Sequence, residues 1–151
     1  MALLEDKGFT AGNFRSFHPG GKLGAQIKHA HDIMHAFAEL PLATIGSVIG
    51  AALPVMTEKR FGCLGIVDET GRLVGIVTDG DLRRNTGPEL ANRKVETLMT
   101  RNPTVITRHV LAAEIIELIN TKRITAVFVV DSDGKPEGLI HIHDLLAIGV
   151  T

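Results

Sequence analysis

VDETGRLVGIVTDGDL, residues 67–82, returns 63 positions later as VDSDGKPEGLIHIHDL, residues 130–145. The two copies align without a gap, so that Asp68 corresponds to Asp131. Self-similarity at a fixed period indicates a duplicated supersecondary unit. Two such units bury their apolar faces against one another, and we expect function in the clefts along their pseudo-twofold seam.

Each copy predicts the same order of elements. Uninterrupted apolar runs are typical of buried strands, and the DETG and DSDG stretches that follow are typical of hairpin turns. Apolar residues at helical spacing precede each first strand, and aspartates favour a helix start after each second strand. The predicted unit is helix, strand, strand, helix, in an α/β (α+β) fold. The predicted helices and strands are Ser47–Lys59, Cys63–Val67 and Leu73–Thr78, then Val110–Lys122, Ala126–Val130 and Glu137–Ile142.

Pro54 interrupts the first predicted helix. A proline removes an amide donor and clashes with the preceding turn, at a cost of about 3 kcal/mol in a regular helix. We therefore expect either a kink at Pro54 or a later helix start.

The hairpins and the two closings, GIVTDGDL and GLIHIHDL, resemble tandem cystathionine β-synthase (CBS) domains. This paired module commonly binds nucleotides or related adenosyl compounds. The resemblance covers Asp32 to Gly149 and implies two pseudo-twofold-related repeats, residues 31–88 and residues 89–151.

Residues 1–30 lie outside the repeat. GFTAGNFRSFHPGGKLG, followed by DIMH and both closings, is similar to the D-arabinose 5-phosphate isomerases. In that family a catalytic SIS domain precedes a CBS pair, and the product feeds 3-deoxy-D-manno-octulosonate (Kdo) synthesis for lipopolysaccharide or capsule. Residues 1–30 would be the tail of the catalytic domain, and His18 would belong to the sugar-phosphate active site. Without the resemblance, His18 is a loop histidine packed beside Pro19.

Aldose–ketose isomerisation needs a base, an electrophile for the carbonyl and donors for the phosphate. In the resembled family the lysine and glutamates for these tasks belong to the preceding domain. Because His18 cannot perform all three, we expect this chain alone to be inactive, although its parent is an isomerase. No cofactor is expected.

The first closing places Thr78 at a strand end and Asp81 in a first helical turn. We expect the hydroxyl and the carboxylate to face one cleft, where a carboxylate suits a ribose diol and free helix amides suit a phosphate. By resemblance, Asp81 holds the ribose and Thr78 the phosphate side. Arg83 and Arg84 could neutralise a phosphate. The alternative leaves the aspartate as a helix cap and the arginines in solvent.

The second closing has His141 at the position of Thr78 and keeps the aspartate as Asp144. An imidazole donates a hydrogen bond and, when protonated, adds positive charge near neutral pH. We therefore expect two unlike pockets. The second suits a ligand with acidic groups, which would gain from His141 and His143. A cytidine monophosphate-linked octulosonate (CMP-Kdo), acting in feedback, fits that description.

The composition narrows the classes of partner. Sixteen Lys and Arg against 17 Asp and Glu give a net charge of −1, so no basic field draws in nucleic acid or an anionic membrane. The single cysteine, Cys63, lies in a strand pattern and is expected in the core. The absence of an apolar leader favours the cytoplasm.

Histidines raise the question of a metal. Zinc needs three or four convergent ligands. His31 and His35 would share a helix face with Asp32 turned elsewhere, so no metal site is predicted.

Three function classes stay open. The chain is a regulatory pair that binds a nucleotide or sugar nucleotide, a pure oligomerisation scaffold, or an adenine-nucleotide sensor of another enzyme. The resemblance implies a homo-oligomer, a dimer of pairs within a tetrameric parent. Ligand-dependent shifts in melting temperature separate binding modules from a scaffold.

Overall fold

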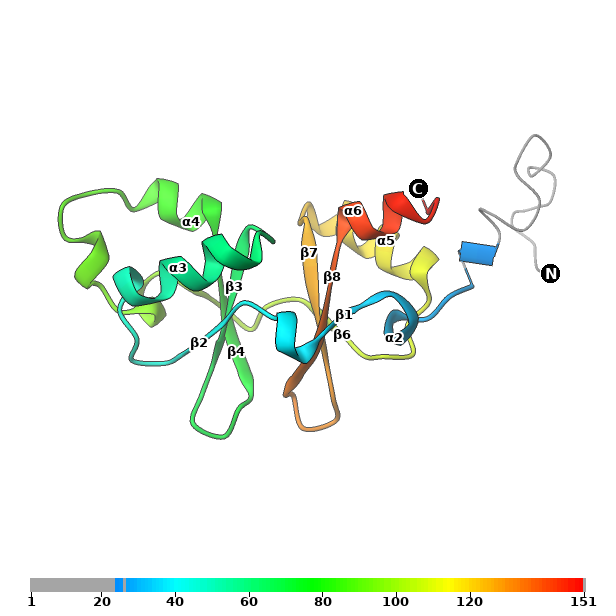
Figure 1. Ribbon diagram of the computed structural model, residues 1–151, viewed down its shortest axis with the longest axis horizontal. Helices are drawn as coiled ribbons and strands as arrows, with labels where there is room; N and C mark the ends of the chain where they lie inside the picture. Colours follow the sequence, from blue (N-terminus) through cyan, green and yellow to red (C-terminus); the bar gives the residue numbers. More distant parts are fainter. Residues whose placement is uncertain (1–23, 26, 151) are drawn as a thin grey trace.

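The computed structural model describes residues 24–25 and 27–150, which form two similar halves side by side (Figure 1). The first half is built from β2 (Leu42–Thr44), α3 (Ile49–Lys59), β3 (Cys63–Val67), β4 (Leu73–Thr78) and α4 (Asp79–Arg84). The second half repeats this order with β6 (Val105–Ile106), α5 (Ala112–Lys122), β7 (Ala126–Val130), β8 (Pro136–His141) and α6 (Ile142–Ala147). The predicted fold class is confirmed, with one short strand in front of each predicted unit.

The buried strands are where the sequence predicts them, and the helices begin later. Both α3 and α5 start two residues after their predicted first residue. The reason is that Val48 and Leu111 are still extended and form isolated bridges, to Lys94 and to His29 respectively. Strand β8 ends at His141, one residue early, because His141 already caps α6.

Pro54 lies within α3, which nevertheless continues to Lys59. The later start that we expected amounts to two residues and leaves the proline inside the helix. Pro54 and Gly50 are both exposed, so water can solvate the carbonyl that lacks an amide partner.

The two sheets exchange edge strands. Strand β1 (His35–Ala36) precedes the first half but pairs with β8, and β5 (Thr100–Arg101) precedes the second half but pairs with β4. Sheet membership therefore crosses, in both directions, the proposed boundary between the repeats after residue 88. Glycines permit the exchange, because Met34 packs on Gly138 and Met99 on Gly75, where no Cβ would fit.

Both hairpin turns form as predicted. The Asp68 carboxylate accepts hydrogen bonds from the amides of Thr70 (2.9 Å) and Arg72 (3.0 Å). Asp131 repeats this arrangement in the second turn. Gly71 and Gly134 have φ of 89° and 81°, which a side chain would make costly.

An apolar cluster joins the two halves. Its buried members come from both sheets and from the residue that follows the 3-10 helix Phe37–Glu39: Cys63, Ala126, Phe128, Leu139 and Leu40. The Phe128 ring packs against Gly65, where an added Cβ would lie 2.8 Å from the ring. The hairpins are also joined, because the Leu73 amide donates to the Gly134 carbonyl over 2.9 Å.

Shorter elements complete the described chain. These are α2 (Ala30–Ile33) and 3-10 helices at Phe37–Glu39, Leu90–Asn92 and Val95–Thr97. In residues 24–25 and 27–150, no helix has the length and apolar character that crossing a bilayer requires.

Candidate functional site

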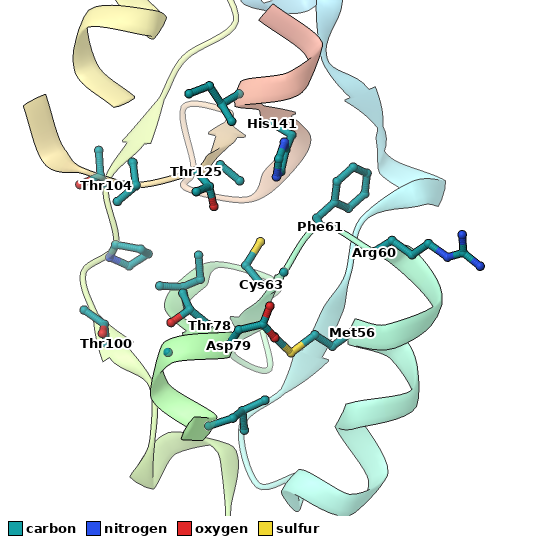
Figure 2. A pocket seen from close by; sticks show the side chains of 18 of the residues that line it. Met56, Arg60, Phe61, Cys63, Thr78, Asp79, Thr100, Thr104, Thr125 and His141 are labelled. Atoms are coloured by element: carbon teal, nitrogen blue, oxygen red, sulfur yellow. The ribbon is translucent and has the colours of Figure 1, made fainter. Parts of the chain in front are cut away.

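A cleft of about 950 Å³ lies between the two halves (Figure 2). The first half contributes the end of α3, the residues that follow it, and the junction of β4 with α4. The second half contributes the residues after α5 and the junction of β8 with α6. Figure 2 shows Thr78 and Asp79 on one side of the hollow and Thr125 and His141 on the other.

Both closings meet at this one cleft, since Thr78 and His141 both line it. The second closing also lines a separate, smaller cavity through His141, His143 and Asp144, so two unlike pockets are present, although both closings share the larger one. The halves pack through Phe128 against Gly65, which brings the ends of the strands together across the seam.

Asp81 caps α4 and is buried, with 7% of its surface exposed. Its carboxylate accepts from the Thr78 amide (2.9 Å), and its own amide donates to the Thr78 hydroxyl (3.3 Å). Arg84 donates to the second carboxylate oxygen over 2.6 Å. Asp81 and Arg84 are therefore engaged with each other and do not line the cleft, contrary to the expectation that Asp81 faces it beside Thr78.

Asp144 caps α6 in the same way, accepting from the His141 amide over 2.8 Å. Its carboxylate also pairs with Nε2 of His35, 3.0 Å from both oxygens. His35 Nδ1 lies 3.1 Å from a carboxylate oxygen of Glu39. These three side chains line a smaller cavity of about 500 Å³, which His141 and His143 also reach.

The surroundings of His141 disfavour its protonated, positively charged form. Burial lowers its pKa below the ordinary histidine value, and the neighbouring His143 and His35 lower it further, while Asp144 acts in the opposite direction. The His143 amide donates to Nδ1 of His141 over 3.1 Å. Nε2 is thereby left as the nitrogen that donates.

Several residues that line the cleft were not predicted: Arg60, Phe61, Asp79, Arg123 and Thr125. The signal was available in the repeat, because KRF and KRI follow the two helices at equivalent positions. Arg60 and Arg123 end α3 and α5 with φ of 64° and 57°, a conformation that favours glycine. The Arg60 guanidinium extends away from the hollow in Figure 2, so Arg83 and Arg123 are the cations that the cleft offers.

Cys63 lies in the wall of the cleft and is buried, as predicted. Burial raises the pKa of its thiol to about 12, and the negative charge of Asp79 adds to the shift. A thiol with such a pKa is a poor nucleophile.

His18 lies outside the described residues. The expectation that His31 and His35 share a helix face is wrong, because α2 ends at Ile33 and His35 lies in β1. Asp32 is not turned elsewhere, since one of its carboxylate oxygens lies 3.2 Å from Nδ1 of His31.

Curated relatives cover nearly the whole chain. The arabinose 5-phosphate isomerase KdsD of Pseudomonas aeruginosa is 40% identical over 153 residues, which is 99% of this chain and 47% of KdsD. KdsD of Yersinia pestis is 39% identical with 99% and 46% coverage. An uncharacterised protein of Rickettsia prowazekii, RP505, is 39% identical over 149 residues. The chain spans about half the length of the curated relatives it matches.

Solved structures share the fold. The CBS domain pair of protein MJ0100, in complex with 5′-methylthioadenosine and S-adenosyl-L-methionine, superposes with a TM-score of 0.70 at 28% identity, over 80% of this chain and 94% of that one. CBSX2 in complex with AMP superposes with a TM-score of 0.71 at 22% identity, over 80% and 94%.

Two segments of the chain, residues 32–86 and residues 95–150, match the CBS domain family, and they contain the two closings that meet at the cleft. The exchanged strands and the pseudo-twofold arrangement agree with that match. The chain therefore belongs to the CBS domain family, as a tandem pair similar to the corresponding part of the KdsD arabinose 5-phosphate isomerases.

Proposed function

We propose that this chain is the regulatory CBS pair of a D-arabinose 5-phosphate isomerase, and that a nucleotide or sugar nucleotide binds in the cleft between its two halves. The similarity to KdsD supports the parent activity. Under this proposal residues 1–30 are the tail of the catalytic domain, and the parent acts in Kdo synthesis in the cytoplasm. The single observation that carries ligand binding is the cleft of about 950 Å³ that both closings share.

Polar groups of the cleft suit a phosphorylated ligand. Thr78 and His141 lie on opposite sides of the cleft, and Arg83 and Arg123 supply positive charge. Arginine binds phosphate oxygens with two parallel hydrogen bonds. Asp79 brings a carboxylate into the same space, where it can accept from ribose hydroxyls or from a base amine.

Aromatic and apolar side chains suit the base. The ring centroids of Phe61 and His141 lie 6.5 Å apart at an angle of 37°, and Ile76 and Leu53 line the same cleft. Nucleotide bases are flat and amphipathic, so they bind best where one face lies on apolar or aromatic surface. The adenosyl ligands of the MJ0100 and CBSX2 pairs have such a base, and CMP-Kdo has a cytosine.

Direct contact of Asp81 or Asp144 with a ribose stays a prediction. Each carboxylate would have to exchange a cap or an ion-pair partner, Arg84 for Asp81 and His35 for Asp144, for the ligand. Contact of Arg84 or His143 with a ligand also stays a prediction. Of these two residues, His143 lines the cleft and Arg84 does not.

Calorimetry and thermal unfolding of the chain with AMP, ATP, S-adenosylmethionine and CMP-Kdo test the proposal. We expect at least one of them to raise the melting temperature, because a ligand at 100 times its Kd stabilises the folded state by about 2.7 kcal/mol. Arg123→Gln should weaken binding, whereas Arg101→Gln, an exposed arginine of β5 that does not line the cleft, should not. Absence of binding by all four compounds would leave the scaffold as the better explanation.

Two further measurements address the parent. We expect the purified chain to show no conversion of arabinose 5-phosphate to ribulose 5-phosphate, and the protein joined to its catalytic domain to show it. Light scattering should give a dimer of pairs for this chain and a tetramer for the parent.

A further inference from the structure

Two histidines and an aspartate gather at the start of the described chain, away from the cleft. One ligand atom from each of His29, His31 and Asp32 lies within 4.8 Å of the others. Nδ1 of His31 is 3.2 Å from Oδ1 of Asp32, and Nδ1 of His29 is 3.8 Å from Oδ2. Ligands at zinc distances on a tetrahedron are about 3.3 Å apart. The three groups are thus spaced for a shared ion after small movements.

The backbone of this cluster is held by the second half of the molecule. The Ala30 amide donates to the Val110 carbonyl (2.8 Å), and the His31 amide donates to the Arg108 carbonyl (3.0 Å). His29 forms an isolated bridge with Leu111. A fixed backbone lowers the entropy that the side chains lose when they bind.

The side chains of the cluster are accessible from solvent. Their exposed fractions are 44% for His29, 35% for His31 and 39% for Asp32. The two imidazole rings lie stacked, 5.4 Å apart and within 6° of parallel. Rotation of each ring about its Cβ–Cγ bond would aim one nitrogen of each at the carboxylate.

We propose that His29, His31 and Asp32 bind one divalent transition-metal ion, with zinc the best fit. Two imidazoles and a carboxylate suit zinc, whereas magnesium and calcium prefer oxygen ligands. The fourth position is left to water. A neighbouring imidazole, that of His109, has its ring centroid 5.8 Å from that of His31 and is not one of the three converging groups.

Metal binding would fasten the segment before α2 to the start of α5. The ligands lie on residues 29–32, whose backbone pairs with residues 108–111. An ion bound only by the folded arrangement stabilises the second half. The cluster shares no residue with the cleft, so this proposal stands apart from nucleotide binding.

The test is metal titration of the whole chain, followed by thermal unfolding and by the visible absorption of bound cobalt as a zinc substitute. We expect one equivalent of zinc to raise the melting temperature and magnesium to leave it unchanged. His31→Gln should reduce zinc affinity by about tenfold or more, in line with the loss of a ligand contact. The metal-free melting temperature of this variant should match that of the parent chain, because the side chain is exposed.

His109→Gln is the matched control, because it removes a neighbouring imidazole without removing a proposed ligand. Zinc should raise the melting temperature of this variant as much as that of the parent chain. Equal zinc affinity in His31→Gln and the parent chain would overturn the proposal. A loss in His109→Gln as large as that in His31→Gln, or no zinc effect at all, would overturn it too, and the histidine–aspartate contacts would then be hydrogen bonds and ion pairs alone.

Discussion

The closings of the two repeats, Thr78–Arg84 and His141–Ala147, share one backbone geometry and differ in the side chain that pairs with the aspartate. In both, an aspartate in the first helical turn accepts from the amide that precedes the helix. Asp81 is then paired by Arg84 from its own helix, whereas the equivalent of Arg84 is Ala147, and Asp144 is paired by His35. The duplicated part of the motif is its helix cap, and the groups around the cap have diverged.

This difference changes what each aspartate connects. Asp81 and Arg84 lie three residues apart, so their pair stabilises one helix. Asp144 and His35 lie 109 residues apart, so their pair ties β1 to the last helix. The aspartate of the second closing thus contacts the segment that leads into the pair, whereas the aspartate of the first is paired within its own helix.

The largest expected effect concerns equivalent positions of β3 and β7, Gly65 and Phe128. Phe128 has 1% of its surface exposed and fills the space that Gly65 leaves. Phe128→Ala should lower the free energy of unfolding by about 3–5 kcal/mol, because it opens a cavity in the cluster that joins the halves. Urea denaturation measures the loss. Phe37→Ala, at a side chain with 61% exposure, is the control and should change stability by under about 0.5 kcal/mol.

Loss of the Asp81 cap and loss of the Asp144 cap should affect different parts of the structure. Asp81→Ala and Asp144→Ala should each lower stability by about 1–2 kcal/mol, since each removes a helix cap. Only Asp144→Ala should also speed amide hydrogen exchange in β1, because only that change releases His35. Equal exchange in both variants would show that the closings are alike in this respect. Asp133→Ala, at an exposed turn, should leave both quantities unchanged.

A smaller effect, of opposite sign, concerns the residues that end α3 and α5. Arg60→Gly and Arg123→Gly should each raise the free energy of unfolding by about 0.5–1 kcal/mol, because glycine adopts positive φ without strain. Arg83→Gly, within α4, should lower it by about 1 kcal/mol. If Arg123→Gly stabilises the fold and also weakens nucleotide binding, the arginine is present for the ligand. If Arg60→Gly and Arg123→Gly both lowered the free energy of unfolding, the positive φ of the two arginines would not be a source of strain.

The smallest expected effect is a slope against pH. The pKa of His141 is lowered in the folded state, so the unfolded chain takes up the proton first as pH falls. The stability that comes from burying neutral His141 is present above the ordinary histidine value of about 6.5 and is lost below it. His141→Asn should therefore flatten the loss of stability between about pH 7 and pH 5. Parallel curves for both proteins would show that His141 does not contribute.

At lower pH, stability depends on other groups, which are the same in the parent chain and in the His141→Asn variant. Hydrogen bonds hold the pKa of the hairpin carboxyls Asp68 and Asp131 below the usual range. Their contribution is present above the ordinary aspartate value of about 3.9 and is lost as pH falls further. The contribution of His141 and that of the hairpin carboxyls are therefore lost in different pH ranges and can be measured separately.

Local rules were enough to predict the strands and turns. Cys63–Val67 and Ala126–Val130 could be predicted to the residue, because an unbroken apolar run bounded by a turn has few alternatives. The hairpins follow from an aspartate that binds its own backbone and a glycine at positive φ. Strands β1 and β5 could not be predicted, because two residues carry no periodicity.

The site was less predictable than the fold. Thr78 and His141 were identified from the closings and do line the cleft. Whether a capping aspartate also faces a ligand depends on its rotamer and neighbours, and Arg84 and His35 occupy the carboxylates. Phe61, Arg123 and Thr125 were missed, although the recurrence of KRF and KRI at the ends of the two helices marks this region, because nothing local shows that these side chains face a cleft.

The duplication, the alternation of helix and strand, the turn chemistry and the family resemblance can all be determined from the order of residues. The duplication is a direct comparison of two stretches of sequence, and the others depend on short local patterns. The exchange of edge strands, the meeting of both closings at one cleft, the lowered pKa of His141 and the approach of His29, His31 and Asp32 depend on contacts between distant segments. Those contacts are set by how the two halves pack, above all Phe128 on Gly65, and packing of that kind leaves no periodic trace in a sequence.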